Sequence, residues 1–396
     1  MHILLISRCP PYPLHLGDRL IVWHLVRELI TSGHTFDLIA LTQRPDDAQE
    51  QPHYAHLFRT ITLLPETPRT IPQYLRRLII PGSRFPQSAD QAWSPDLWMT
   101  VSARLQSTHY DGVHVFGGIQ VYEIAHALKT LPAIITPYES FALYMQRQMA
   151  QNPTMMNRLQ EIAARAYERF MYRPYKQVIV LAEPDAEMLR RLSLEPDLPI
   201  KVIPNGIDLE HFTGERPNIA SNSLLFVGNY EYLPNVEAAL LLIDKIFPVV
   251  RAFNSDATLS IVGNAPPDVL RDRAGNGVVI TGRVEDIREA YARAAVFVSP
   301  LITGAGIKNK ILEALAMRVP VVATPLSMDG IRVQQGRDVL IAPVEQMAET
   351  IIRLLQNETL QRDMGQAGRA LIESEYSWRR VGAEYETLYR KVFRAS

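Results

Sequence analysis

Two lysines and a glutamate on one short predicted helix could carry chemistry. In residues 299–325 an apolar strand leads into a glycine-containing loop, and the next helix bears Lys308, Lys310 and Glu313. The start of a helix disfavours cations by roughly 0.3–1 kcal/mol each, because the dipole and the unpaired N–H groups are positive there. We therefore expect an anion at this turn. A phosphate or diphosphate would meet the loop amides, the helix end and both ammonium groups.

Glu313 lies about one and a half turns further along, in an otherwise apolar stretch. A carboxylate in such surroundings needs a partner, and a ribose diol can donate two hydrogen bonds to it. The alternative is an ordinary strand-to-helix turn, with solvated lysines and Glu313 paired to a neighbouring side chain. We favour the phosphate and ribose interpretation.

The start of the chain predicts a strand, a helix and a second strand. Residues 2–7 and 36–41 are apolar runs, and a helix is expected from Asp18, which can cap it. Gly17, Asp18 and Arg19 then face the crevice in which open α/β sheets bind ligands. A capping Asp18 beside a surface Arg19 explains the same residues equally well.

Two later strands of the first half end in residues that suit a ligand. The predicted strand 113–116 ends in Gly117 and Gly118, where a helix is expected and missing side chains let a ligand approach the backbone. The predicted strand 133–137 has Glu139 at its carboxyl end. This half predicts a β-α unit repeated about six or seven times.

A linker with many prolines and glycines follows at 194–222, and the alternation then restarts. Three predicted strands of the second half, 224–227, 258–262 and 278–281, each stop at a glycine-bearing turn. The first turn contains Gly228 and Asn229, the second contains Gly263, and the third contains Gly282 and Arg283. An edge so rich in accessible backbone suits a nucleotide.

Residues 69–85 contain four arginines, seven large apolar residues and no acidic residue. Such a basic amphipathic segment can lie on an anionic membrane surface or bind a lipid-linked acceptor. The alternative, a helix that packs against its own domain, is somewhat favoured.

Composition limits the class of protein. With 396 residues and 47% hydrophobic content, two domains are expected. The net charge of −1 gives no general attraction to nucleic acid, although residues 1–181 are mildly basic. A single cysteine, no signal-like start and no apolar run of about 18–20 residues predict a cytoplasmic protein, with any membrane contact peripheral, at the inner face of the plasma membrane.

In order and spacing, several short motifs resemble those of retaining glycosyltransferases with the GT-B fold, of the family-4 (group 1) type. They are GDR at 17–19, VIPNGID at 202–208, FVG at 226–228, IVG at 261–263, TGRV at 281–284, LEALA at 312–316 and PVVAT at 320–324. The resemblance covers nearly the whole chain.

The resemblance implies an α/β fold of two Rossmann-like, doubly wound domains facing each other across a cleft. The first would be 1–205, joined by a C-terminal helix at 377–396 that crosses back, and the second would be 206–376. The second would bind the nucleotide-sugar donor, with a UDP- or GDP-sugar expected.

By the same resemblance, individual residues receive roles. Glu313 would bind the ribose, and the turn with Gly282, Arg283 and Val284 would bind the base. The acceptor would enter from the first domain, near Glu139 and residues 69–85. The diphosphate and sugar would contact the loop that contains Gly304, Ala305, Gly306 and Ile307, together with Lys308 and Lys310. Gly17 of the first domain would close over them.

The chain departs from the family pattern at three places. The first motif glutamate falls at Ala305, and a sub-branch of the family has a glycine-rich loop and lysines there instead. The Arg and Lys common after the first donor-domain strand are missing from 228–233, which leaves the diphosphate to Lys308 and Lys310. Arg318 stands near the position of a usual glycine.

The implied reaction is transfer of a hexosyl group to a hydroxyl of a glycan, a lipid-linked acceptor or a small molecule, with retained anomeric configuration and no cofactor or metal. A non-catalytic, sugar-nucleotide-binding partner protein is the alternative, because of Ala305 and the missing basic pair. A nucleotide-sugar epimerase is a third reading. A dinucleotide oxidoreductase is disfavoured, since Gly-x-Gly-x-x-Gly does not follow the first strand.

Overall fold

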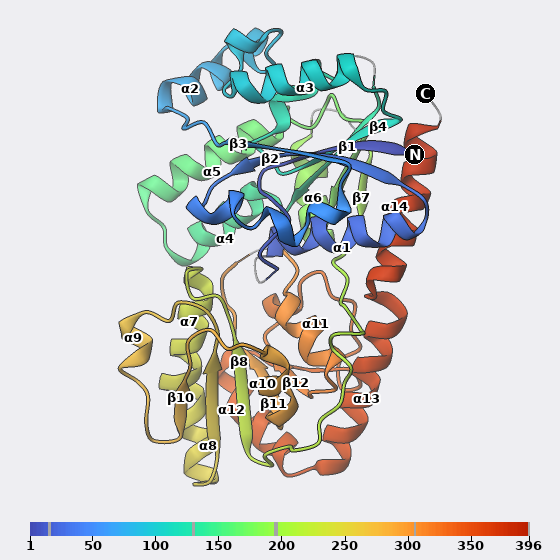
Figure 1. Ribbon diagram of the computed structural model, residues 1–396. Helices are drawn as coiled ribbons and strands as arrows, with labels where there is room; N and C mark the ends of the chain where they lie inside the picture. Colours follow the sequence, from blue (N-terminus) through green and yellow to red (C-terminus); the bar gives the residue numbers. More distant parts are fainter. Residues whose placement is uncertain (15–16, 129–130, 194–196, 305, 395–396) are drawn as a thin grey trace. The chain divides into compact units, whose positions relative to one another are not determined.

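The computed structural model describes residues 1–14, 17–128, 131–193, 197–304 and 306–394 (Figure 1). The chain divides into two compact units. Unit 1 is Met1–Asn205 with Trp378–Ser396, and unit 2 is Gly206–Ser377. Each unit is a Rossmann-like parallel α/β sheet, so the α/β class predicted from the sequence is confirmed.

The sheet of unit 1 has seven strands among the described residues, in the order β3-β2-β1-β4-β5-β6-β7, and every neighbouring pair is parallel. The strands are β1 (His2–Ser7), β2 (Thr35–Thr42), β3 (Thr60–Pro65), β4 (Gly112–Phe116), β5 (Ala133–Tyr138), β6 (Gln177–Val180) and β7 (Ile200–Val202). The central strands are continuous apolar runs because helices cover both faces. In the register, Leu5 pairs with Leu38 on one side and with His114 on the other.

The helices of unit 1 are α1 (Gly17–Thr31), α2 (Ile71–Ile79), α3 (Pro95–Ser107), α4 (Phe141–Gln151), α5 (Met155–Glu168), α6 (Glu183–Leu192) and α14 (Trp378–Phe393). Ser140 and Thr154 cap α4 and α5, because their hydroxyls accept from the N–H groups of Leu143 and Asn157.

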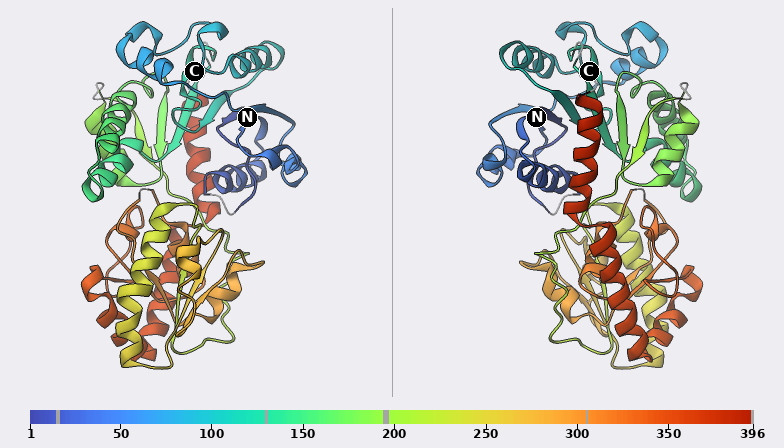
Figure 2. Two further views of the ribbon diagram at one scale, coloured as in Figure 1. Left: turned by 90° about the vertical axis from the view of Figure 1, so that its left-hand side faces the viewer. Right: turned by 90° about the vertical axis from the view of Figure 1, so that its right-hand side faces the viewer.

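The last helix, α14, packs beside α1 and against the sheet of unit 1 (Figure 2). The rings of His24 and Trp378 stack with centroids 5.0 Å apart. Buried His114 on β4 has its two ring nitrogens 2.6 Å from Tyr389 Oη and 2.8 Å from Thr136 Oγ1. These contacts bind the C-terminal helix to α1 and β4.

The sheet of unit 2 has the order β10-β9-β8-β11-β12-β13, again with parallel pairs. Its strands are β8 (Ser223–Val227), β9 (Thr258–Val262), β10 (Val278–Ile280), β11 (Val296–Ser299), β12 (Val321–Ala323) and β13 (Leu340–Ile341). Its helices are α7 (Leu233–Leu241), α8 (Phe247–Phe253), α9 (Asp268–Arg271), α10 (Ile287–Arg293), α11 (Asn309–Ala316), α12 (Val344–Leu355) and α13 (Glu358–Glu375), with a π-helical turn at Leu242–Ile246 between α7 and α8.

Several local predictions were wrong. A strand, β7, lies inside the predicted linker. The chain does not enter an α-helix after Gly118, because the Gly118 carbonyl closes a turn with the N–H groups of Val121 and Tyr122, and a short 3-10 helix follows. Asp18 does not cap α1, which already begins at Gly17. The last helix begins at Trp378, and Ser377 instead pairs with Ile207.

Two negative findings hold for the described part of the chain. It contains no helix that is long and apolar enough to span a bilayer. It also contains no cluster of three His, Cys, Asp or Glu side chains that could hold a metal ion.

A buried ion pair joins the start of α1 to the loop after β2. Arg19 Nη1 lies 2.6 Å from Asp47 Oδ1, and both side chains are only 2% exposed. The N–H groups of Gln43 and Arg44 donate to Asp47 Oδ2 at 2.8 and 3.0 Å. Burial opposes ionisation of Asp47, but the hydrogen bonds from Arg19 and these amides keep its pKa below the usual value. Arg19 is thus engaged inside unit 1, neither on the surface nor presented to a ligand.

We expect Asp47→Ala to lower the free energy of unfolding by about 3–5 kcal/mol, because it leaves the Arg19 cation buried without a counter-ion. Urea denaturation would measure this change. The control is Glu183→Ala, which removes an exposed ion pair with Arg190 and should cost about 1 kcal/mol or less. Equal effects of the two substitutions would contradict a structural role for the Arg19–Asp47 pair.

Candidate functional site

The carboxyl ends of β8 and β11 form the switch point of the unit 2 sheet. These strands are neighbours, but the chain continues from β8 to β9 on one side and from β11 to β12 on the other. In open parallel sheets, ligands bind outside the carboxyl ends at such a point, because the flanking loops diverge there. The structure therefore brings together two predicted segments: Gly228 and Asn229 after β8, and the glycines and lysines of 304–310 after β11.

The turn after β8 is closely packed. Gly263, at the end of β9, has a φ of +141°, and a Cβ atom there would lie 1.9 Å from the Gly228 carbonyl oxygen. Only glycine allows this approach. Asn235 Nδ2 donates to the Asn229 carbonyl at 2.8 Å. The backbone of this turn is therefore held in place by the protein itself.

Both predicted lysines lie at the start of α11, and both have neutral partners. Lys308 is the N-cap residue, is buried, and donates from Nζ to the Gly306 carbonyl. Lys310 Nζ donates to Asn235 Oδ1 at 2.5 Å and lies 4.6 Å from the centre of the Phe226 ring. An amide oxygen and an aromatic ring hold the ammonium group of Lys310 without neutralising its charge.

Burial and neighbouring charges shift the pKa values of Lys310 and Glu313. Burial, with a further contribution from the charge of Lys308, lowers the pKa of Lys310 to about 7, against the opposing influence of Glu313. Burial also raises the pKa of Glu313, although Tyr291 and Lys310 favour its charged form. A lysine with such a pKa is readily protonated when an anion binds next to it.

Tyr291, from α10, is a site residue that the sequence did not reveal. Its fully buried hydroxyl lies 2.8 Å from Glu313 Oε2 and 3.1 Å from the carbonyl of Lys310. It therefore fixes the glutamate relative to α11. A single tyrosine in a short helix is indistinguishable from a core residue in the sequence, so no signal could have identified it.

The other predicted donor residues are spread along the same sheet edge. Gly304 is buried with a φ of +109°, and a Cβ atom there would lie 3.1 Å from Tyr232 Oη. Ile307 is half-buried next to the lysines, and Ala305 lies outside the described residues.

The turn with Gly282, Arg283 and Val284 follows β10, which is separated from β8 by β9. Gly282 and Arg283 are exposed and Val284 is half-buried. Because β10 follows β9 in the strand order, this turn lies one strand further from the switch point than Gly263 does.

The switch point of unit 1 lies between β1 and β4 and contains an ion pair. Asp18 accepts from Arg8 Nε and Nη2 at 3.2 and 3.0 Å and from Cys9 Sγ at 3.3 Å. Burial opposes ionisation of Asp18, but Arg8 and Cys9 keep its pKa below the usual value. Tyr138 Oη donates to the Asp18 carbonyl at 3.2 Å. Gly17, the first residue of α1, is exposed next to this cluster.

The remaining predicted acceptor-side residues follow β4 and β5. Gly117 has a φ of +127°, and a Cβ atom there would lie 2.9 Å from Arg8 Cβ, so the backbone of the β4 turn packs directly on the Arg8 side chain. Gly118 comes next, and Glu139 is half-buried one residue after β5. Arg8, which the sequence analysis did not single out, therefore links the two sides of this switch point.

A shallow hollow also lies in unit 1, at the carboxyl ends of β2 and β3. It is lined by Thr42, Gln43, Glu66, Thr67, Pro68, Arg69 and Tyr74. Arg69 is ion-paired to Glu66 at 3.0 Å and donates to the Gln120 carbonyl at 3.1 Å. The hollow therefore borders both the β4 loop and the start of α2.

Two family profiles match the chain. Residues 20–211 match Glycosyltransferase Family 4, and residues 221–357 match Glycosyl transferases group 1. The first match lies almost entirely in unit 1 and the second lies in unit 2.

Sequence relatives include an uncharacterized 44.6 kDa protein of the cps region of Klebsiella pneumoniae, 25% identical over 45% of this chain and 49% of that protein. A phosphatidyl-myo-inositol mannosyltransferase of Mycobacterium leprae is 28% identical over 56% and 61%. A GDP-mannose-dependent monoacylated alpha-(1-6)-phosphatidylinositol monomannoside mannosyltransferase of Corynebacterium glutamicum is 30% identical over 46% and 53%. The chain thus spans about half to three fifths of the length of these relatives.

Solved structures agree over the whole chain. Sucrose-phosphate synthase of Thermosynechococcus elongatus has a TM-score of 0.73 at 18% identity and covers 100% of both chains. HepE of Anabaena, solved in complex with UDP and glucose, has a TM-score of 0.67 at 15% identity and covers 98% of this chain and 99% of that one. The fold is therefore GT-B, and one matched profile falls in each of its two units.

Proposed function

We propose that this protein transfers a hexosyl group from a UDP- or GDP-sugar to a hydroxyl acceptor. The observation that carries the proposal is the position of Lys308 and Lys310 at the unit 2 switch point, where a diphosphate would bind, with Lys310 held by an amide oxygen and an aromatic ring. The names of the relatives support the donor class: one depends on GDP-mannose, and HepE was solved with UDP and glucose.

In this proposal the donor lies along the carboxyl edge of the unit 2 sheet. The amides of the 304–307 loop and the N-terminal end of α11 bind the diphosphate and sugar together with Lys308 and Lys310. Glu313, positioned by Tyr291, accepts hydrogen bonds from the ribose hydroxyls. The turn with Gly282, Arg283 and Val284 contacts the base.

Lys310 also supplies the cation that the turn after β8 lacks. Residues 228–233 contain no Arg or Lys, yet Lys310 Nζ reaches Asn235, close to the first residues of α7. A positive charge from α11 therefore stands beside the β8 turn. This arrangement supports activity despite the missing basic pair.

During transfer the bond between the anomeric carbon and the diphosphate oxygen breaks, and a bond between that carbon and the acceptor oxygen forms. Negative charge develops on the departing diphosphate, where the ammonium groups and amides stabilise it. The acceptor hydroxyl gives its proton to this diphosphate, so no cofactor or metal is part of the proposal. We propose that Gly17 closes over the sugar and phosphate, and that the acceptor is bound by unit 1 near Gly117, Gly118 and Glu139.

We expect the double variant Lys308→Ala, Lys310→Ala to lower kcat by about 10²- to 10³-fold, because it removes charge aimed at the leaving group. Lys245→Ala, which changes an exposed lysine of unit 2, is the matched control and should keep the parent rate. Transfer would be followed as release of nucleoside diphosphate, and thermal melting would check folding.

Parent-like turnover of the double variant would contradict the diphosphate assignment. Binding of the sugar nucleotide by the parent, with neither transfer nor donor hydrolysis across a broad acceptor screen, would instead favour the non-catalytic alternative.

The pKa of Lys310 predicts a pH-dependent affinity for the donor. A bound diphosphate favours the charged lysine and raises its pKa above the ligand-free value of about 7, so binding above pH 7 requires uptake of a proton. Affinity for UDP-glucose or GDP-mannose should therefore fall between pH 7 and 9, by at most about tenfold per pH unit. Calorimetry would measure both the affinity and the proton uptake.

Lys310→Arg is the control for this pH profile, because arginine stays charged throughout that range. Its affinity should be nearly independent of pH between 7 and 9. A flat profile for the parent would show that Lys310 is already charged in the free protein or that it does not contact the diphosphate.

Retention of configuration is a separate element of the proposal and rests on the family resemblance. Proton NMR of the product formed from an α-linked sugar nucleotide should show an α-linkage from the first minutes of the reaction. A β-linked product would mean that the acceptor attacks from the opposite face, and the leaving-group mechanism would then be wrong.

A further inference from the structure

Helix α2 turns most of its aliphatic side chains away from the protein, and only Leu78 packs on the core. Ile71, Leu75 and Ile79 are 75%, 49% and 73% exposed. They are spaced four residues apart, so they form one line along the helix, and Ile80 extends it. We call these four residues the aliphatic ridge. Amphipathic helices of globular proteins normally bury such a line, so this orientation needs an explanation.

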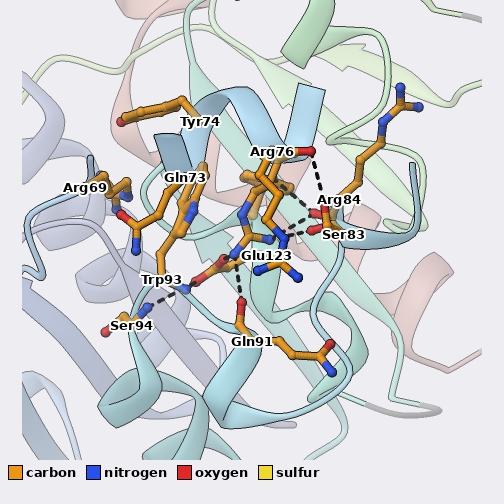
Figure 3. A network of polar contacts seen from close by, with 12 residues as sticks. Arg69, Gln73, Tyr74, Arg76, Ser83, Arg84, Gln91, Trp93, Ser94 and Glu123 are labelled. Carbon is orange, nitrogen blue, oxygen red and sulfur yellow. Dashed lines mark hydrogen bonds and ion pairs between the residues drawn. The ribbon is translucent and has the colours of Figure 1, made fainter. Parts of the chain in front are cut away.

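The inner side of α2 carries a network of polar contacts (Figure 3), beside Tyr74 and Leu78, which pack on the core of unit 1. Arg77 is buried, and its guanidinium lies 2.7 Å from Glu123 Oε2. It also donates to the carbonyls of Ser83 and Gln91 at 3.0 and 3.1 Å, and it lies 4.3 Å from the centre of the Trp93 ring. Rotating α2 to bury the aliphatic ridge would expose this arginine and leave Glu123 buried without its counter-ion.

Tyr74 and the N-terminal cap also fix the orientation of α2. The carbonyl of Tyr74 accepts from Tyr167 Oη of α5 at 2.6 Å, and its ring packs against Trp93. Thr70 and Gln73 form a capping box, in which Gln73 Oε1 accepts from the Thr70 N–H at 2.8 Å. Helix α2 therefore packs on its own domain, as the favoured sequence interpretation expects, through the face that carries Tyr74 and Arg77.

The charge around the aliphatic ridge selects one kind of occupant. Residues 69–85 contain no acidic residue, and exposed Arg76 stands next to Leu75 on α2. A second copy of the chain would bring this arginine close to its own symmetry mate, which repels it. The ridge is also only roughly 12 Å long at 1.5 Å per residue, which is short for a stable protein interface. A lipid surface requires neither charge complementarity from a folded partner nor a large interface.

We propose that the aliphatic ridge of α2 docks unit 1 onto an anionic lipid bilayer. The helix lies parallel to the membrane, its aliphatic side chains enter the boundary between headgroups and acyl chains, and Arg76 contacts lipid phosphates. This contact is peripheral and reversible. It goes beyond the proposed function, because it requires no donor and no transfer.

Vesicle flotation of the full chain tests the proposal. We expect the parent to bind vesicles containing phosphatidylglycerol and to bind pure phosphatidylcholine vesicles far less. Leu75→Ser with Ile79→Ser should lower partitioning onto anionic vesicles at least tenfold, because both side chains are exposed and their loss leaves the fold intact. The matched control is Val249→Ser with Phe253→Ser on α8, where the side chains are 50% and 58% exposed in unit 2, and it should bind like the parent.

A charge reversal tests the role of Arg76. Arg76→Glu should weaken binding to anionic vesicles several-fold, whereas Arg362→Glu on α13, another exposed arginine and one that lies in unit 2, should not. Failure of the parent to bind anionic vesicles, or unchanged binding of the Leu75 and Ile79 variant, would overturn the proposal. So would a parent dimer in light scattering that this variant abolishes, since the ridge would then join two copies of the chain.

Discussion

The hydrogen bond between Lys310 and Asn235 is the interaction on which the candidate site depends. It connects α11, which follows β11, to α7, which follows β8, and so it spans the unit 2 switch point. Its donor is an ammonium group deprived of water, and its acceptor is a neutral amide oxygen. The Phe226 ring below adds an attraction to the cation but no negative charge. The cation is thus positioned by its surroundings without being neutralised.

This absence of neutralisation is the reason why we propose a diphosphate as the ligand of the site. A carboxylate in direct contact with Lys310 would form an ion pair that any incoming anion had to break. Glu313, the nearby acid, instead accepts from Tyr291, which also donates to the Lys310 carbonyl. Burial and the charge of Lys308 lower the pKa of Lys310, and a bound anion would favour its charged form. Preorganised charge of this kind stabilises a leaving group without reorganisation during the reaction.

The sequence predicted what depends on local pattern and missed what depends on distant partners. Apolar runs and the glycines after β8, β9 and β11 identified both sheets and the crevice edge of unit 2, because strand period and backbone freedom are local properties. The partners of the charged residues were not predictable: Asn235 lies 75 positions from Lys310, and Asp47 lies 28 positions from Arg19. Arg19 for this reason appeared to be a ligand contact or a surface residue, although it is buried in an ion pair.

Helix α2 shows the same limit, because the sequence indicates an amphipathic segment but not which of its faces packs on unit 1. Burying aliphatic surface gains about 25 cal/mol per Å², whereas a buried ion pair such as Arg77–Glu123 is often no more stabilising than apolar residues of similar volume. Stability of unit 1 alone would therefore favour an α2 that turns its isoleucines inward and carries no arginine at position 77. The chain instead keeps the costly polar anchor and leaves the aliphatic side chains in water. The proposed contact of the outer face of α2 with a lipid bilayer would account for this loss of stability.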